Sequence, residues 1–151
     1  MKRIVMFSAV LAVTVEMMAC NQQKEAPKVV LESFVGHFEN AQNIKWNQEK
    51  PNEWEAEFTM NTIDYSATFD QNGNWLETEH KIDKSELPEE VALSINESYA
   101  DYSIEETEMV ETPQIKTAYE VTIESGEEDI VLVIDTTGKI LKKEIENDDE
   151  D

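Results

Sequence analysis

The chain has 151 residues, and its 12 Lys and Arg against 34 Asp and Glu give a formal net charge of −22. This length allows one or two small domains but excludes a large multidomain enzyme, and the charge argues against nucleic acid as a partner. Five Phe, four Tyr and three Trp are too many for a disordered acidic chain, so we expect it to fold. The one Cys excludes an internal disulfide and a Cys-based zinc site.

Residues 1–19 have the pattern of a secretion signal. Two basic residues precede an apolar run from Ile4 to Val15, and the small residue Ala19 stands directly before Cys20. The run covers about 18 Å as a helix, which is short of the hydrocarbon core of about 30 Å. We therefore expect a cleaved signal and no stable transmembrane helix.

The segment Met17–Cys20 resembles a bacterial lipobox, with Met17 where a leucine is usual. The resemblance implies that Cys20 becomes lipidated and anchors the protein to a membrane, with residues 20–28 as a polar tether. The protein is then expected to be extracytoplasmic, in the periplasm or at the outer membrane or cell surface. The alternative is an ordinary signal followed by a buried structural Cys20.

Two short helices are expected, one at the start of each half of the remaining chain. Pro27 and Pro88 stand where a first helical residue belongs, because proline has a helix-compatible φ and lacks the N–H that would stay unpaired there. Apolar residues four positions apart follow each proline: Val30, Phe34 and Phe38 after the first, and Val91, Ile95 and Tyr99 after the second.

After the first helix the apolar residues alternate with polar ones, which is typical of strands. The pattern covers residues 44–46, 54–58 and 65–69. Asn72-Gly73 then predicts a two-residue hairpin turn, because both central residues of the favoured turn need positive φ. Thr137-Gly138 is a weaker equivalent in the second half.

The chain contains an internal repeat. Residues 64–79 align without gaps on residues 129–144 at a constant offset of 65, whereas the two helices match at an offset of 61. Five pairs are identical: Asp64/Asp129, Asp70/Asp135, Gly73/Gly138, Leu76/Leu141 and Glu79/Glu144. We therefore expect two copies of one unit, residues 29–84 and 85–146, within one domain over 29–146.

Each copy is predicted to be one helix followed by four antiparallel strands. A domain of about 60 residues alone buries only about 60% of its unfolded surface, so we expect the copies to depend on each other and to share one sheet. The predicted fold is α+β, an antiparallel sheet of about eight strands with both helices on one face. Residues 147–151, almost all acidic, are expected to form a disordered tail.

The sheet face away from the helices is the candidate binding face. It is expected to be acidic, and because Trp75 and Leu76 are adjacent, one of them must leave the helix-covered side. We expect Leu76 and its repeat equivalent to form an apolar patch within the acidic surface. The candidate residues are Glu55, Glu57, Thr68, Leu76, Glu120, Glu124 and Leu141.

The sequence offers no catalytic constellation. His37 and His80 are the only imidazoles, no Gly-x-Ser-x-Gly motif occurs, and the spacing of Asp70–Asn74 does not fit a calcium loop, so that segment is interpreted as a turn. We expect no catalytic residue, no cofactor and no defined metal site. Two alternatives stay open: surface binding of a divalent cation such as calcium, and a carboxylate-dependent hydrolase accessory.

The order of motifs resembles a known family. Trp46, the segment Phe-Asp-x-x-Gly-x-Trp over 69–75, and Leu87-Pro88 are similar to the PepSY-like, beta-lactamase-inhibitor-like domains of secreted Gram-negative lipoproteins. The resemblance covers residues 29–146 and implies an antiparallel sheet with a concave face and helices packed behind it. It implies no reaction. By analogy of shape it implies that the acidic face binds or inhibits a protein partner, which we expect to be basic or cationic.

Overall fold

The computed structural model describes residues 25–126 and 128–146. The predicted signal at 1–19, the lipidation site Cys20 and the acidic tail at 147–151 lie outside the described residues. No helix in the described part of the chain is long and apolar enough to cross a membrane.

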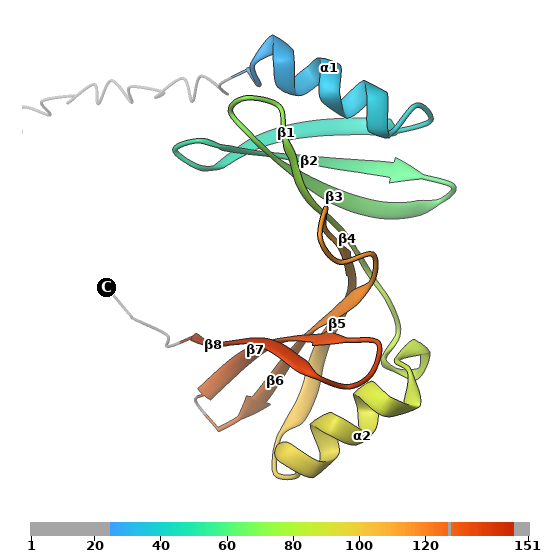
Figure 1. Ribbon diagram of the computed structural model, residues 1–151, viewed down its shortest axis with the longest axis vertical. Coiled ribbons are helices and arrows are strands. Elements are labelled where there is room, and N and C mark those ends of the chain that lie inside the picture. Colours follow the sequence, from blue (N-terminus) through green and yellow to red (C-terminus); the bar gives the residue numbers. More distant parts are fainter. Residues whose placement is uncertain (1–24, 127, 147–151) are drawn as a thin grey trace, which may run out of the picture.

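All eight strands form a single antiparallel sheet, in the order in which they occur along the chain (Figure 1). The elements are α1 (Lys28–His37), β1 (Gln42–Lys50), β2 (Glu53–Met60), β3 (Ile63–Asp70), β4 (Trp75–Lys81), the 3₁₀ helix η1 (Lys84–Glu86), α2 (Glu89–Ser98), β5 (Ser103–Glu111), β6 (Ala118–Ser125), β7 (Glu128–Asp135) and β8 (Ile140–Glu146). The predicted α+β fold is therefore confirmed.

The two prolines position the helices, one residue later than the sequence indicates. Pro27 and Pro88 are the residues before α1 and α2, each with φ of −55° and an extended ψ, so they remain outside the helix. Their carbonyl oxygens accept the first helical hydrogen bonds. Each helix then buries two residues one turn apart: Val30 and Phe34 in α1, and Val91 and Ile95 in α2.

The duplication is visible in the strand register. The β2–β3 pairing begins with Glu53 opposite Asp70, and the β6–β7 pairing begins with Ala118 opposite Asp135, exactly the same pairs shifted by 65. The last strand of each half carries a β-bulge at the same place, at Leu76 in β4 and at Leu141 in β8. The two halves are thus copies of one α-β4 unit.

The turn at Asn72-Gly73 is not the predicted two-residue turn. Gly73 has φ of 83°, but Asn72 does not have positive φ. The Asp70 carboxylate instead accepts the backbone N–H groups of Asn72 and Asn74, at 2.8 and 2.9 Å, which closes a three-residue loop. The left-handed two-residue turn lies at Asn61-Thr62, with φ of 52° and 71°.

The sheet is shared by the two halves, but the buried core is not. One cluster joins α1 to β2 and β3, with Val30 and Phe34 against Trp54, Phe58 and Phe69. A second cluster joins α2 to β6 and β7, and its members are Val91, Ile95, Tyr119, Val121, Ile123, Ile130, Leu132 and Ile134. The expectation that the two copies share one sheet is confirmed, and each half has its own buried core.

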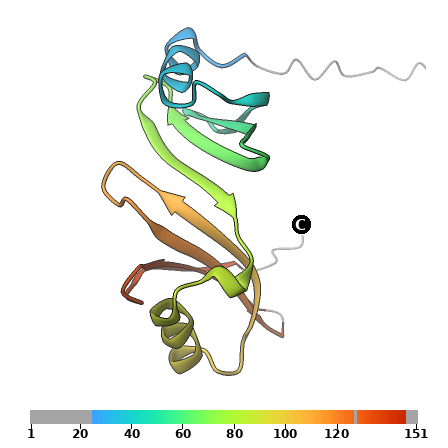
Figure 2. The ribbon, with the colours of Figure 1, turned by 90° about the vertical axis from the view of Figure 1, so that its right-hand side faces the viewer.

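Both helices lie behind the same face of the sheet. Directly paired residues share one side of the sheet, so the buried side can be followed from strand to strand. The core residue Ala67 pairs with Thr78 in β4. His80, two residues after Thr78 and on the same side, pairs with Met109, which pairs with the core residue Tyr119. The sheet bends between the halves, so α1 and α2 lie on the outside at opposite ends of the molecule (Figures 1 and 2). The other face lines the inside of the bend, and we call it the open face.

Candidate binding face and its carboxylate cluster

Cross-strand pairs define the open face, because directly paired residues share one side of a sheet. One row runs from Glu57 through Ser66, Glu79, Val110 and Ala118 to Asp135. The next row runs from Lys81 through Glu108, Glu120 and Val133 to Lys142. The open face is therefore continuous across the junction between the halves.

The strand register places five of the seven candidate residues on this face. Glu55 pairs with Thr68, and Glu57 alternates with the buried residues of β2. Glu120 and Glu124 alternate in the same way with the core residues of β6. Glu57 lies at the outer part of the face, where Lys45 Nζ is 3.9 Å from its carboxylate.

Leu76 and Leu141 occupy equivalent positions, each the additional residue of a β-bulge. Trp75 pairs with Phe69, packs against the first core and donates its Nε1–H to Thr78 Oγ1 at 2.9 Å. Leu76 is half-buried and Leu141 is 41% exposed. The bulge interrupts strict alternation at this point, so adjacency to Trp75 does not by itself give the direction of Leu76.

Three glutamates meet at the centre of the open face, on the strands that join the two halves. Glu79 on β4, Glu108 on β5 and Glu120 on β6 have carboxylate oxygens that all lie within 4.8 Å of one another. We call this group the carboxylate cluster. Glu108 and Glu120 are directly opposite each other in the register, and two like charges in such a cross-strand pair destabilise the sheet.

Burial and mutual repulsion shift the acidity of this cluster. Burial, followed by repulsion from Glu79, Glu108 and Glu77, raises the pKa of Glu120 to about 7. The pKa of Glu108 is raised by burial and then by Glu79 and Glu106. Near neutral pH, Glu120 is thus divided between its protonated and ionised forms, and a nearby cation would favour the ionised form.

Basic residues only partly offset the charge of the cluster: Lys81 and Lys142 lie near it and lower the pKa of Glu108 and Glu120, but burial and the neighbouring glutamates raise both pKa values further. Its one hydrogen-bond donor within the described chain is Ser66, whose Oγ–H donates to Glu79 at 3.0 Å. The five ion pairs of the described residues, including Lys81 with Glu106 and Lys142 with Glu144, leave the cluster out. Chemically, this arrangement attracts a cation supplied from outside.

Sequence reasoning missed Glu79 and Glu108 as site residues. Glu79 carried a signal, since it is identical to Glu144 in the repeat. Glu108 carried none, because β5 contains the adjacent pair Glu105 and Glu106 and a register shift between Ile104 and Glu106. These interrupt the alternation that would have placed Glu108 on the open face.

The remaining singled-out residues lie in structural positions. Trp54, 6% exposed, belongs to the first core as expected. His37 Nδ1 is 2.9 Å from the Ser33 carbonyl oxygen one helical turn away, and the His80 ring lies 4.9 Å from that of Tyr65. The segment Asp70–Asn74 is a turn, as expected, because the Asp70 carboxylate is engaged by backbone and side-chain N–H groups of that loop.

Comparison with known proteins supplies a family and a set of similar folds. Residues 52–142 match the family model described as "Putative beta-lactamase-inhibitor-like, PepSY-like". The matched segment contains β2 to β7, α2 and the whole carboxylate cluster. The search of curated proteins found no match to the chain.

Several crystal structures from Bacteroides share this fold. A BLIP-like protein from Bacteroides fragilis is 26% identical, with a TM-score of 0.70 and coverage of 85% of this chain and 93% of that one. A DUF2874 family protein from Bacteroides ovatus is 20% identical, with a TM-score of 0.72 and coverage of 83% and 93%. A protein from Bacteroides eggerthii described as putative periplasmic is 18% identical, with a TM-score of 0.70 and coverage of 81% and 90%.

Proposed function

We propose, because this chain belongs to the beta-lactamase-inhibitor-like, PepSY-like family, that it is a non-catalytic binding module whose open face binds or inhibits a protein partner. The BLIP-like description of the Bacteroides fragilis relative supports such a role. The observation that carries the proposal is the carboxylate cluster at the centre of a continuous open sheet face. The partner is expected to present a basic surface, because the nearby Lys81 and Lys142 offset only part of the negative charge on this face.

We place this module outside the cytoplasm, anchored through Cys20. The apolar run before Ala19 and the resemblance of Met17–Cys20 to a lipobox support this location. The description of the Bacteroides eggerthii relative as periplasmic is in agreement. Labelling cells with radioactive palmitate tests the anchor: the label is expected in the wild-type protein and is expected to be lost in Cys20→Ser.

Site-specific cross-linking tests the binding face. A photoreactive residue at Thr122, which lies on the open face beside the cluster, is expected to capture a partner in the native envelope. The same residue at Leu93, which is 50% exposed on α2, is the control on the opposite face. Capture from Leu93 but not from Thr122 would contradict the proposal.

Charge reversal tests what the face recognises. Glu108→Lys with Glu120→Lys is expected to reduce capture of the identified partner at least tenfold, since two attractive contacts become repulsive. The matched control reverses Glu39 and Glu97, which are exposed outside the open face. Equal losses in both double variants would indicate a general effect of net charge instead of recognition by this face.

Divalent-cation binding is the alternative that the same three carboxylates leave open. Carboxylate oxygens are the ligands that calcium prefers, and those of Glu79, Glu108 and Glu120 are close enough to share one ion. Calorimetric titration with calcium separates the two functions. Heat and a rise in melting temperature that disappear in Glu108→Gln would favour cation binding. The absence of both signals in the wild-type protein would exclude this alternative.

The hydrolase alternative needs carboxylates in a closed pocket. The cluster instead lies on an open face, with all three side chains only half-buried. This geometry supports binding over catalysis.

A further inference from the structure

Among the described residues the sheet has two free edges, β1 and β8, because each of these strands pairs with one neighbour only. A free edge presents unpaired backbone N–H and C=O groups and can add another strand. Two register shifts interrupt the pairing of β1, and Asn43 within it has a φ of 56°. The register of β8 is regular from Lys142 to Glu146. The edge of β8 is therefore the one that suits the addition of a strand.

The side chains of β8 are exposed on both faces of the sheet. Lys142 and Glu144 lie on the open face, where they form an exposed ion pair at 3.0 Å. Ile145 pairs with the core residue Ile130 and lies on the helix side, but beyond the core it is exposed. Counting back along the regular part of the strand puts the exposed Leu141 on the same side as Ile145. The edge thus offers charged side chains on one face and apolar side chains on the other.

The strand register also shows which backbone groups of β8 point away from β7. Asp135, the last residue of β7, donates its N–H to the Lys139 carbonyl oxygen at 3.0 Å and so faces β8. Because the direction alternates along a strand, Val131 faces β8 as well, and its partner there is Glu144. Lys143, next to Glu144, therefore points its N–H and C=O groups to the free edge, as does every second residue of the regular part of β8.

The sequence of this edge is complementary to itself in one antiparallel register. Two copies of β8 can exchange backbone hydrogen bonds only if the twofold axis passes a residue that points to the free edge, such as Lys143. With the axis there, Lys142 of each copy lies opposite Glu144 of the other, and Leu141 lies opposite Ile145. An axis two residues further along would instead oppose two glutamates. The register about Lys143 therefore pairs opposite charges on one face and apolar side chains on the other.

Two sources of repulsion are reduced at this edge. Lys143 meets its own copy at the axis, but its ammonium group lies 5.3 Å from the centroid of the Tyr99 ring, which holds it on the helix side. The net charge of −22 opposes self-association in general. However, residues 139–146 contain three lysines and two glutamates, so two copies would meet at a segment that is not acidic.

We infer that two copies of this protein associate through their β8 edges, in antiparallel register about Lys143. The eight strands of each copy then continue as one sheet across the twofold axis. Because directly paired residues share one side of a sheet, the open faces of both copies lie on the same side. This association goes beyond the proposed function, since it uses no residue of the carboxylate cluster and needs no other protein.

Charge variants test the register. Sedimentation equilibrium of the mature protein, with Cys20→Ser to exclude lipidation, is expected to show a dimer at up to about 1 mM, the weak end of specific association. Lys142→Glu and Glu144→Lys are each expected to weaken the dimer roughly tenfold, because each makes two attractive pairs repulsive. An equimolar mixture of the two variants is expected to restore it, since each copy then carries the charges that the other lacks.

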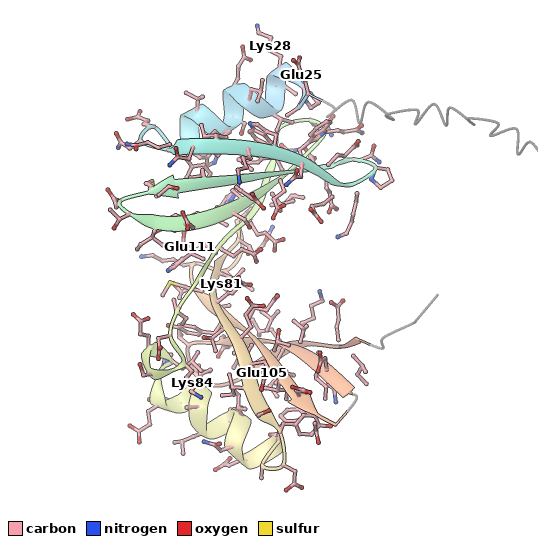
Figure 3. All side chains as sticks on the ribbon, turned by 180° about the vertical axis from the view of Figure 1, so that it is seen from behind. Glu25, Lys28, Lys81, Lys84, Glu105 and Glu111 are labelled. Carbon is pink, nitrogen blue, oxygen red and sulfur yellow. The ribbon has the colours of Figure 1, made fainter. Side chains whose placement is uncertain are left out.

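A matched ion pair on α1 provides the control. Lys28 and Glu32 are exposed, 3.0 Å apart, and lie on α1 at the end of the molecule away from β8 (Figure 3). Lys28→Glu and Glu32→Lys change the net charge by the same amounts and are expected to change the dimer affinity less than twofold. A melting curve for each variant verifies that it is folded.

A backbone variant tests the edge itself. Lys143→Pro removes an N–H that points to the free edge, so the single chain is expected to stay folded while the dimer is lost. A protein that remains monomeric at the highest concentration would overturn the inference. So would a dimer that Lys142→Glu weakens no more than Lys28→Glu, or that the mixture fails to restore. Assemblies that grow beyond a dimer would also overturn it, because they would indicate pairing of β8 with β1.

Discussion

The pKa of Glu120 reflects the electrostatic repulsion within the carboxylate cluster. Burial and the neighbouring glutamates raise its pKa to about 7, whereas the reference value is 4.5. Between these values the folded protein binds more protons than the unfolded chain, so the free energy of unfolding increases as pH falls from about 7 towards 4.5. Above about pH 7 the ionised carboxylate destabilises the folded state in full.

The corresponding prediction is that Glu120→Gln both stabilises the protein and flattens its pH dependence. At pH 8 the free energy of unfolding is expected to rise by roughly 0.2–1 kcal/mol, because a like-charged cross-strand pair is removed. At pH 5 the difference from wild type is expected to shrink. Urea unfolding at both values measures it, with Glu124→Gln, a half-buried glutamate of the same strand, as the control. A larger gain at pH 5 would contradict the assignment.

Gly138 is a second position where a single residue decides the packing. Its φ is 84°, and an added Cβ would lie 2.5 Å from the Glu90 carbonyl oxygen at the start of α2. Gly73 makes the equivalent approach to Val29 in α1, at 2.8 Å. In each half, the turn before the last strand therefore packs directly on the helix backbone.

We predict that Gly138→Ala costs more than Gly126→Ala. Both substitutions place a side chain at positive φ, which costs about 1–2 kcal/mol, but nothing lies within 4 Å of a Cβ at Gly126. The difference between the two variants in urea unfolding measures the clash with α2. Equal losses would mean that the turn moves away from the helix without cost.

At the scale of elements, the spacing of apolar residues predicts the helices and those strands in which buried and exposed residues alternate without interruption. The α1 pattern of Val30 and Phe34 and the β2 pattern of Trp54, Ala56 and Phe58 appear in the structure as expected, because each buried residue faces the same core. A strand was expected after α2, but the place of Glu108 on it was not predicted, because a register shift in β5 breaks the period of two. The carboxylate cluster depends on pairing between strands far apart in sequence, which local patterns do not encode.

Phe34 fixes α1 on the sheet, and its loss is expected to destabilise the first half. It is 2% exposed and lies edge-on to Phe58 at 5.1 Å and to Trp46 at 5.3 Å. Phe34→Ala is expected to cost about 3–5 kcal/mol, measured by urea unfolding. Val35→Ala, one residue along and 62% exposed, is the control and should cost well under 1 kcal/mol. A small loss in Phe34→Ala would show that α1 is not required by the core.

At the scale of the whole molecule, two cores are joined by a narrow seam. The β4–β5 pairing consists of four residue pairs, from Thr78 with Glu111 to Lys81 with Glu108. The neighbouring β3–β4 pairing also has four, whereas β2–β3 and β6–β7 have eight each. Thr107 reinforces the seam, because its hydroxyl donates to the Ile82 carbonyl oxygen at 2.7 Å. The halves are therefore expected to lose structure separately.

Hydrogen exchange tests this separation. Ile95→Ala removes a side chain that is 2% exposed in the second core and is expected to cost that half about 2–5 kcal/mol. Amide protection should fall in β6 and β7 while β2 and β3 keep theirs. The exposed Leu93→Ala is the control. A uniform loss over both halves would show that they unfold as one unit.

The short seam also sets how far apart the outer edges of the sheet stand. Each half has its own buried core, so a small change of twist at the four joining pairs is expected to change the distance between β1 and β8, the outermost strands. Substitutions at those pairs would change the width of the opening while leaving both interiors intact. We therefore expect one strand contact to set the distance between the outer strands of the duplicated unit.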